Sequence, residues 1–93
     1  MSRTVRAQPL QLARGVWPDE QIEDPVAEVA RRFAVNLRSA LGARSVRSVA
    51  AAAGLSHVTV LNVLAGRVWP DLATIVRLEQ SLNTPLWPTH PLS

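Results

Sequence analysis

The residues best placed for chemistry in this chain lie between Ser56 and Arg67, and they are suited to hydrogen bonding. Asn62 carries an amide that both donates and accepts, and His57 carries an imidazole. No acidic residue stands at a chelating helical spacing from His57 or His90, and the chain has no cysteine, so we expect no metal site. Because the chain also lacks an activated nucleophile, a carboxylate pair and a glycine-rich phosphate loop, we expect neither an enzyme nor a cofactor.

The distribution of charge is more informative than the net charge of +3. All ten basic residues are arginine, and residues 25–70 hold six of them against a single acid, Glu28. A basic domain of this kind attracts phosphate. The alternative is a solvated arginine face, which charge alone does not exclude.

With 93 residues, the chain has room for one domain with tails. Residues 1–24 lack helical periodicity, so we expect an arm or linker there, followed by a domain over residues 25–88 and a tail over residues 89–93. The sequence has no secretion signal and no apolar run near the roughly 20 residues that span a bilayer. We therefore expect a cytoplasmic protein that does not enter membranes.

Residues 46–66, VRSVAAAAGLSHVTVLNVLAG, predict two short helices joined by a tight turn. Ser45 and Ser56 are suited to cap the two helices, and Gly54 suits a left-handed position in the turn. The alanines of the first helix let the second approach closely. Two helices joined in this way can project the second one outward, and the DNA major groove is wide enough to admit it.

Longer helices on either side must supply the core that holds this pair. Asp24-Pro25 predicts the start of a helix that reaches about Leu41, and Asp71 predicts the start of another after Pro70. Glu28 and Arg32 form an i,i+4 pair that we expect on the outer face. The expected inner stripes are Val26, Val29, Ala30, Phe33, Leu37 and Leu41 in the first helix and Leu72, Ile75, Leu78 and Leu82 in the last.

A final turn at Leu86-Trp87 would close this core. The expected fold is then an all-α compact bundle of about five helices that contains a helix-turn-helix, with an extended N-terminal arm.

These residues together resemble the phage-repressor/Cro-like family of helix-turn-helix proteins, often called the XRE family. The resemblance covers roughly residues 26–87, and its motifs are Val49-Ala50, Ala53-Gly54-Leu55-Ser56, Thr59-Val60, Val63, Gly66, Pro70, Leu72, Thr74-Ile75, Leu78 and Leu82. It implies a transcription regulator that binds double-stranded operator DNA as a homodimer. The simplest such protein is a bacterial or phage repressor that acts at the nucleoid.

In this family, the start and outer face of the second helix of the pair read bases, and the matching positions here are His57, Val58, Leu61 and Asn62. Asn62 can pair with adenine, His57 can reach a guanine acceptor or a phosphate, and the two apolar side chains can contact thymine methyl groups. Phosphate contacts in such folds come from the ends of both helices. The candidates at those ends are Arg44, Ser45, Arg47, Ser56 and Arg67.

Two positions depart from the family pattern. Val46 stands where glutamine is frequent, and Val58 and Leu61 stand on a face that is usually more polar. They leave two alternatives open. One is weaker direct readout of bases. The other is a second interpretation, in which the chain is an interaction module or antitoxin whose apolar helix face, or arm, binds a protein such as a toxin or regulator.

The N-terminal arm leaves its own alternatives open. Arg3 and Arg6 can enter a minor groove, as basic arms do, or the arm is a disordered tail. Trp17 stands within the arm and can dock onto the domain or onto a partner.

Overall fold

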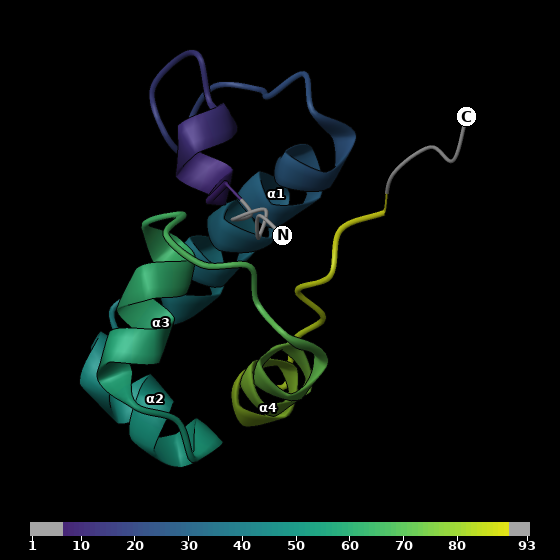
Figure 1. Cartoon of the computed structure of the whole chain (residues 1–93). Coiled ribbons are helices and arrows are strands. Elements are labelled where there is room, and N and C mark those ends of the chain that lie inside the picture. The colour runs from purple at the N-terminus through teal and green to yellow at the C-terminus, as the bar shows by residue number, and fades with distance from the viewer. Residues whose placement is uncertain (1–6, 90–93) are drawn as a thin grey trace, which may run out of the picture.

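The computed structural model describes residues 7–89, and this part of the chain is helical with no strand. A short 3-10 helix, η1 (Pro9–Leu12), precedes four α-helices, α1 (Pro25–Leu41), α2 (Val46–Ala53), α3 (His57–Leu64) and α4 (Leu72–Leu82). Figure 1 shows α2 and α4 packed at one end of the molecule, with α3 between α2 and the upper part of α1. The predicted all-α class is confirmed.

Each α-helix begins after the polar residue that the sequence predicts as its N-cap. The Asp24 carboxylate accepts two backbone N–H groups at 3.0 and 2.9 Å, and the Ser45 and Ser56 hydroxyls each accept one at 3.1 Å. Asp71 accepts the N–H of Thr74 at 2.7 Å, and this bond holds the pKa of the Asp71 carboxyl below its usual range. A cap of this kind stabilises a helix by about 1 kcal/mol, so four local signals fix where the helices start.

The core is an apolar cluster to which all four α-helices contribute. Burying each large side chain of this cluster stabilises the fold by about 1.5–3 kcal/mol. The buried members are Phe33, Leu37 and Leu41 of α1, Val49, Ala50 and Ala53 of α2, Val60 and Val63 of α3, Ile75, Leu78 and Leu82 of α4, and Leu86.

Two positions predicted for the inner stripes are wrong. The side chains of Val26 and Leu72 are 59% and 78% exposed. Each stands in the first turn of its helix, which extends past the edge of the core, so helical spacing alone assigns them to the wrong environment. Thr74 is buried in α4 instead.

The predicted helical turn at Leu86-Trp87 is also wrong, so the described chain has four α-helices where the sequence predicts five. The Glu79 carboxylate accepts the backbone N–H groups of Leu86 at 2.7 Å and Trp87 at 3.0 Å. These bonds hold the non-helical Leu86-Trp87 segment against α4. Leu86 is fully buried there, and Trp87 stays half-exposed.

The largest correction concerns the predicted extended arm. Residues 7–24, which we call the N-terminal strap, fold back over the helices with Pro9 and Ile22 buried. The Leu10 N–H donates to the Gly66 carbonyl at 2.8 Å, and the Trp17 Nε1–H donates to the Leu64 carbonyl at 2.8 Å. Arg3 and Arg6, the predicted minor-groove contacts, lie outside the described residues.

The strap is also tied to α1 through Glu28. Its carboxylate accepts the Ile22 N–H at 2.9 Å, two Arg31 N–H groups at 2.7 Å each, and the Arg32 Nε–H at 3.0 Å. Arg31 also donates to the Pro18 carbonyl at 3.0 Å. Glu28 does pair with Arg32 as predicted, but the expected outer-face position is wrong because the strap covers Glu28 and leaves it only 8% exposed.

Within the described residues, no single helix is long and apolar enough to cross a membrane. The α2–α3 pair reaches that length and apolarity only when its two helices are taken together, and they are bent by 117°.

Candidate nucleic-acid interface

The turn between α2 and α3 sets the direction in which α3 leaves the domain. Gly54 adopts the left-handed conformation with φ 70° and ψ 30°, as the sequence predicts, and its N–H closes the last turn of α2. Ser56 then begins α3, and the chain bends by 117° between the two helices. The bend leaves one face of α3 on the core and the other turned outward.

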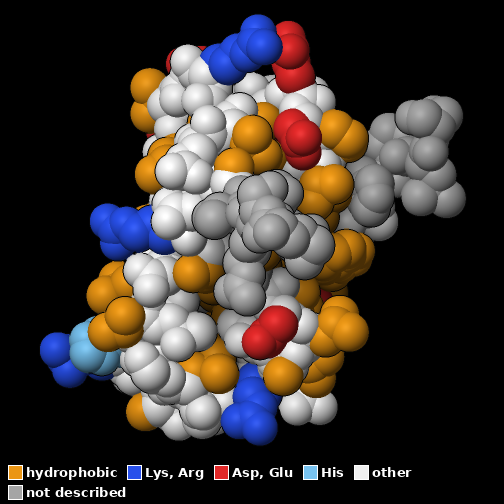
Figure 2. Space-filling view, viewed as in Figure 1, with side chains coloured by type: hydrophobic (Ala, Val, Ile, Leu, Met, Phe, Trp, Pro, Cys, Tyr) orange, Lys and Arg blue, Asp and Glu red, His pale blue; other side chains and the backbone are white. Residues whose placement is uncertain are grey.

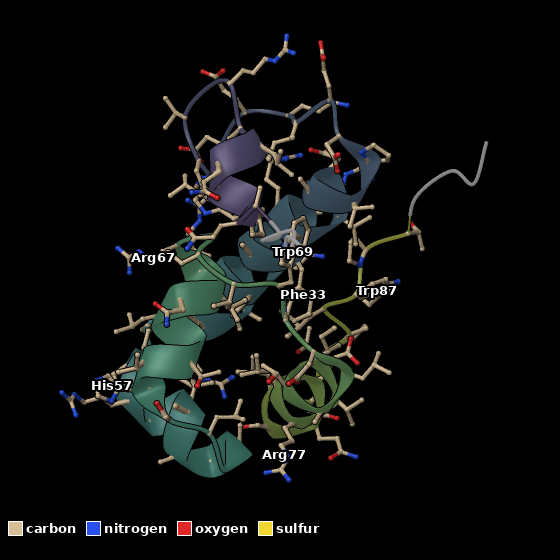
Figure 3. The ribbon with its side chains drawn as sticks, in the orientation of Figure 1. Phe33, His57, Arg67, Trp69, Arg77 and Trp87 are labelled. Atoms are coloured by element: carbon tan, nitrogen blue, oxygen red, sulfur yellow. The ribbon has the colours of Figure 1, made fainter. Side chains whose placement is uncertain are left out.

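The two faces of α3 have opposite environments. Val60 and Val63 are buried, whereas the side chains of Val58 and Leu61 are 51% and 42% exposed. The predicted base-reading residues form two adjacent pairs, 57–58 and 61–62, one helical turn apart, so α3 brings both pairs to one side, with His57 at the amino end. The outward face consists of His57, Val58, Leu61 and Asn62, and Figure 3 shows His57 and Arg67 at opposite ends of α3 on the same edge of the molecule.

Arginines stand at both ends of this face. Arg44 and Arg47 flank the start of α2, Arg67 follows the end of α3, and all three are exposed. Figure 2 shows hydrophobic side chains between blue basic side chains along this edge, with the pale blue histidine beside one of them. The edge thus combines apolar contact surface with positive charge.

The ion pairs of the domain leave these arginines out. Arg14, Arg31, Arg32 and Arg38 pair with carboxylates of Glu23, Glu28 and Asp19. Within residues 7–89, the arginines that form no ion pair are Arg44, Arg47, Arg67 and Arg77. Five of the seven carboxylates of the chain lie on the strap and α1, whereas Asp71 lines the cleft beside Asn62 and Glu79 lies in α4.

Asn62 and Arg67 lie next to each other at the carboxyl end of this face. The Arg67 N–H donates to the Asn62 carbonyl at 2.9 Å, and an Arg67 guanidinium N–H lies 3.5 Å from the Asn62 side-chain oxygen. The second contact is at the limit of a hydrogen bond and is exposed, so it costs little to replace. The arrangement leaves an amide and a guanidinium side by side for an external acceptor.

Ser45 and Ser56, which are predicted to contact phosphates, also have a structural role as N-caps. Both hydroxyl oxygens accept backbone N–H groups as N-caps. A serine hydroxyl keeps its own proton as a donor while its oxygen accepts, and both residues are exposed. The caps therefore fix the two hydroxyls in place without using their donor capacity.

The sequence analysis missed Arg77. This α4 residue donates weakly to the Gly54 carbonyl at 3.5 Å, which places it at the α2–α3 turn. Figure 3 shows it at the end of the molecule under α4, apart from the edge that carries His57 and Arg67. No local pattern could reveal this contact, because 23 positions separate the two residues.

Two hollows open on the surface, one of them beside the outward face of α3. A groove of about 380 Å³ has Phe33, Trp69 and Trp87 as its aromatic walls, all labelled in Figure 3, and its other lining residues are Pro25, Val26, Val29, Ala30 and Pro70. A smaller cleft of about 190 Å³ opens beside Asn62, between α3 and the start of α4. Within residues 7–89, no group of three or more His, Asp or Glu side chains is placed to hold a metal ion.

No protein-family model, curated protein or solved structure matches this chain.

Proposed function

We propose that this protein is a sequence-specific regulator of transcription that binds double-stranded DNA with α3 in the major groove. The observation that carries the proposal is the outward face of α3, an apolar and amide-bearing surface with unpaired arginines at both ends. This role is the one implied by the resemblance of the sequence to phage-repressor/Cro-like helix-turn-helix proteins. In this role it acts as a bacterial or phage repressor by occupying an operator at the nucleoid, without enzymatic activity or cofactor.

The geometry of α2 and α3 supports this assignment. The bend of 117° lies within the range of about 90–120° that is typical of a helix-turn-helix. The major groove is about 12 Å wide, which admits an α-helix with a diameter of about 10–12 Å, and the eight residues of α3 would lie within it for about 12 Å of their length. Arginines at the two ends of the pair would then lie near the phosphates that border the groove.

Charge supports it independently. Residues 29–70 contain no aspartate or glutamate, so nothing within the α2–α3 segment repels a phosphate backbone. Arg44, Arg47 and Arg67 would contact phosphates, with the hydroxyls of Ser45 and Ser56 as further donors.

The outward face supplies the groups that would read bases. The Asn62 amide can donate to and accept from adenine, and His57 can donate to a guanine acceptor or a phosphate. Val58 and Leu61 can bury the methyl groups of thymine. A homodimer on a palindromic site fits the size of the domain, because its extents of 39, 32 and 24 Å are similar to the roughly 34 Å between half-sites one helical turn apart.

The test is the salt dependence of binding to a fluorescently labelled random-sequence duplex. The logarithm of the affinity should fall linearly with the logarithm of the salt concentration. Arg47→Ala and Arg67→Ala should each reduce this slope by about one, whatever the DNA sequence. Arg14→Ala is the control, because the Arg14 side chain is 85% exposed on the strap, where its nearest carboxylate is that of Glu23 at 3.7 Å.

Failure of the wild-type chain to bind the duplex at low salt would refute the proposal. Binding with an unchanged slope in both Arg47→Ala and Arg67→Ala would remove those two side chains from the interface.

A second function is favoured by one observation. Val58 and Leu61 of α3 are 51% and 42% exposed and lie three positions apart, so together they form an apolar surface that a protein partner can cover. In this alternative the chain is an antitoxin or interaction module, and α3 binds a toxin or regulator protein. Removal of thymine methyl groups should weaken binding in the first function and leave the protein partner's binding unchanged in the second.

A further inference from the structure

The carboxyl end of α3 is held by the strap and not only by its own helix. The Trp17 Nε1–H donates to the Leu64 carbonyl at 2.8 Å, and the Leu10 N–H donates to the Gly66 carbonyl at 2.8 Å. The last carbonyls of a helix have no partner within the helix, and these two donors come from residues far away in the sequence. The strap therefore supplies part of the C-cap of α3.

The Trp17 ring also fills the space beside Gly66. A Cβ atom on Gly66 would lie 2.6 Å from the ring, closer than any real contact, so the indole lies directly against the glycine backbone. Gly66 has φ 73°, a left-handed conformation that a residue with a side chain rarely adopts. Both facts make glycine necessary at this position, and Trp17 occupies the space that the missing side chain leaves.

Arg67 directly follows Gly66, the residue against which the Trp17 ring packs. Its backbone direction is fixed on one side by the Gly66 contacts with Trp17 and Leu10, and on the other by the bond from its own N–H to the Asn62 carbonyl at 2.9 Å. The position from which the Arg67 side chain leaves the chain thus depends on the strap.

The residues that follow Trp17 in the strap are themselves bonded to α1, which holds the indole in place. Arg31 of α1 donates to the carbonyl of Pro18, the residue after Trp17, at 3.0 Å, and Asp19 pairs with Arg38 at 3.1 Å. Trp17 is therefore connected to α1 on one side and to α3 on the other.

We propose that Trp17 is a positioning residue for the DNA interface, which acts by fixing the end of α3 from which Arg67 reaches the phosphate backbone. The proposal rests on the DNA-binding function proposed above. Residues 7–24 are then a working part of the interface although they supply no predicted contact to DNA themselves.

The test is Trp17→Phe, which keeps an aromatic ring beside Gly66 and removes the Nε1–H donor. Its control is Trp87→Phe, because Trp87 follows α4, is half-exposed and belongs neither to the strap nor to α3. Affinity is measured for a labelled random-sequence duplex at low salt. Trp17→Phe should weaken binding by about two- to tenfold, the effect of one hydrogen bond, and Trp87→Phe by less than about twofold.

The decisive measurement is a double-mutant cycle with Arg67→Ala. If Trp17 acts through Arg67, Trp17→Phe should have little further effect once the arginine is gone. Losses that multiply in the double variant would overturn the positioning role while leaving the DNA-binding proposal intact. Absence of binding by the wild-type chain would instead overturn the DNA-binding proposal.

A second measurement does not depend on how well Trp17→Phe folds. In the wild-type chain, the NMR resonance of the Trp17 Nε1–H should shift when the duplex is added, and the shift should be lost in Arg67→Ala. The resonance of the half-exposed Trp87 is the internal reference. The proposal would be overturned if the Trp17 Nε1–H resonance did not shift when the duplex is added, or if it shifted by the same amount in Arg67→Ala as in the wild type.

Discussion

Protonation of Glu28 should release the strap and destabilise the whole domain. This carboxylate accepts hydrogen bonds from Ile22 of the strap and from Arg31 and Arg32 of α1. The hydrogen bonds from Arg31, opposed in part by burial, lower the pKa of Glu28 from 4.5 to about 2. The same bonds raise the pKa of Arg31, so Glu28 is the partner of this pair that loses its charge in acid.

The magnitude follows from the difference between folded and unfolded pKa values. One pKa unit corresponds to about 1.4 kcal/mol, so a fall from 4.5 to about 2 gives roughly 3 kcal/mol of stability. The Glu28 and Arg31 side chains are only 11% and 14% exposed, which limits screening by solvent, whereas Arg32 at 38% contributes less. A domain of this size has a free energy of unfolding of about 5–15 kcal/mol, so this one carboxylate matters.

The direction is set by which state binds the proton. Between pH 4.5 and about 2 the unfolded chain takes up a proton at Glu28 and the folded chain does not. The contribution is therefore complete above pH 4.5 and is lost as the pH falls toward 2.

The assay is urea unfolding of the wild type, Glu28→Gln and the control Glu23→Gln at pH values from 6 to 2. Between pH 5 and 2 the wild type should lose about 3 kcal/mol more stability than Glu28→Gln. At pH 7, Glu28→Gln should itself cost about 3 kcal/mol, because it leaves the Arg31 guanidinium without its counter-ion. Glu23→Gln should follow the wild type closely, since the Glu23 side chain is 81% exposed and 3.7 Å from Arg14. Equal acid sensitivity in the wild type and Glu28→Gln would refute the assignment.

Three further predictions concern α3 and its turn. Asn62→Ala should loosen base preference at one position of the selected site by about 1–3 kcal/mol with the fold intact, and an unchanged binding motif after selection would exclude Asn62 as a reader. If Val58 and Leu61 contact thymine methyl groups, uracil in place of thymine should weaken binding and the double change Val58→Ser with Leu61→Ser should do the same without unfolding; a double variant that keeps full DNA affinity but loses a co-purifying protein would favour the antitoxin or interaction module. Gly54→Ala should lower stability by about 1–2 kcal/mol in thermal unfolding, because φ of 70° disfavours a side chain there, and an unchanged Tm would contradict the left-handed turn.

The parts of the fold that the sequence predicts correctly are those that depend on neighbouring residues. The N-caps Asp24, Ser45, Ser56 and Asp71 all act within three positions along the chain, so their pattern is visible without tertiary structure. The same holds for Gly54 and for the buried face of α3, because spacing along one short helix determines which side chains share a face.

The errors come from interactions between distant residues. Helical spacing assigns Val26 and Leu72 to the core, but it carries no information about where the core ends. Leu86 is buried as expected, yet the carboxylate of Glu79 and not a helical turn satisfies its backbone.

The strap could not be predicted for the same reason. Its bonds to Leu64 and Trp69 span 47 and 62 positions along the chain. Its sequence also has no periodicity from which a docked segment could be predicted. Which arginines remain unpaired is also a tertiary result, because Asp19 of the strap neutralises Arg38 of α1. The outward face of α3 is predictable from spacing along the helix. Docking of Trp17 onto the domain is one of two alternatives that the sequence leaves open, and its acceptor, the Leu64 carbonyl, could not be predicted from the sequence.

The strap also has a consequence for the time at which the domain matures during synthesis. Trp17 is translated 47 residues before Leu64, its hydrogen-bond acceptor, and Ala7 is translated 62 residues before Trp69. At about 5–20 residues per second, Leu64 is added to the chain roughly 2–10 s after Trp17. Until then the indole has nothing to cap, and the end of α3 cannot take its final shape even after α1 and α2 have been made. The first described part of the domain to be synthesised therefore completes its contacts only after residues 64–69 have been made.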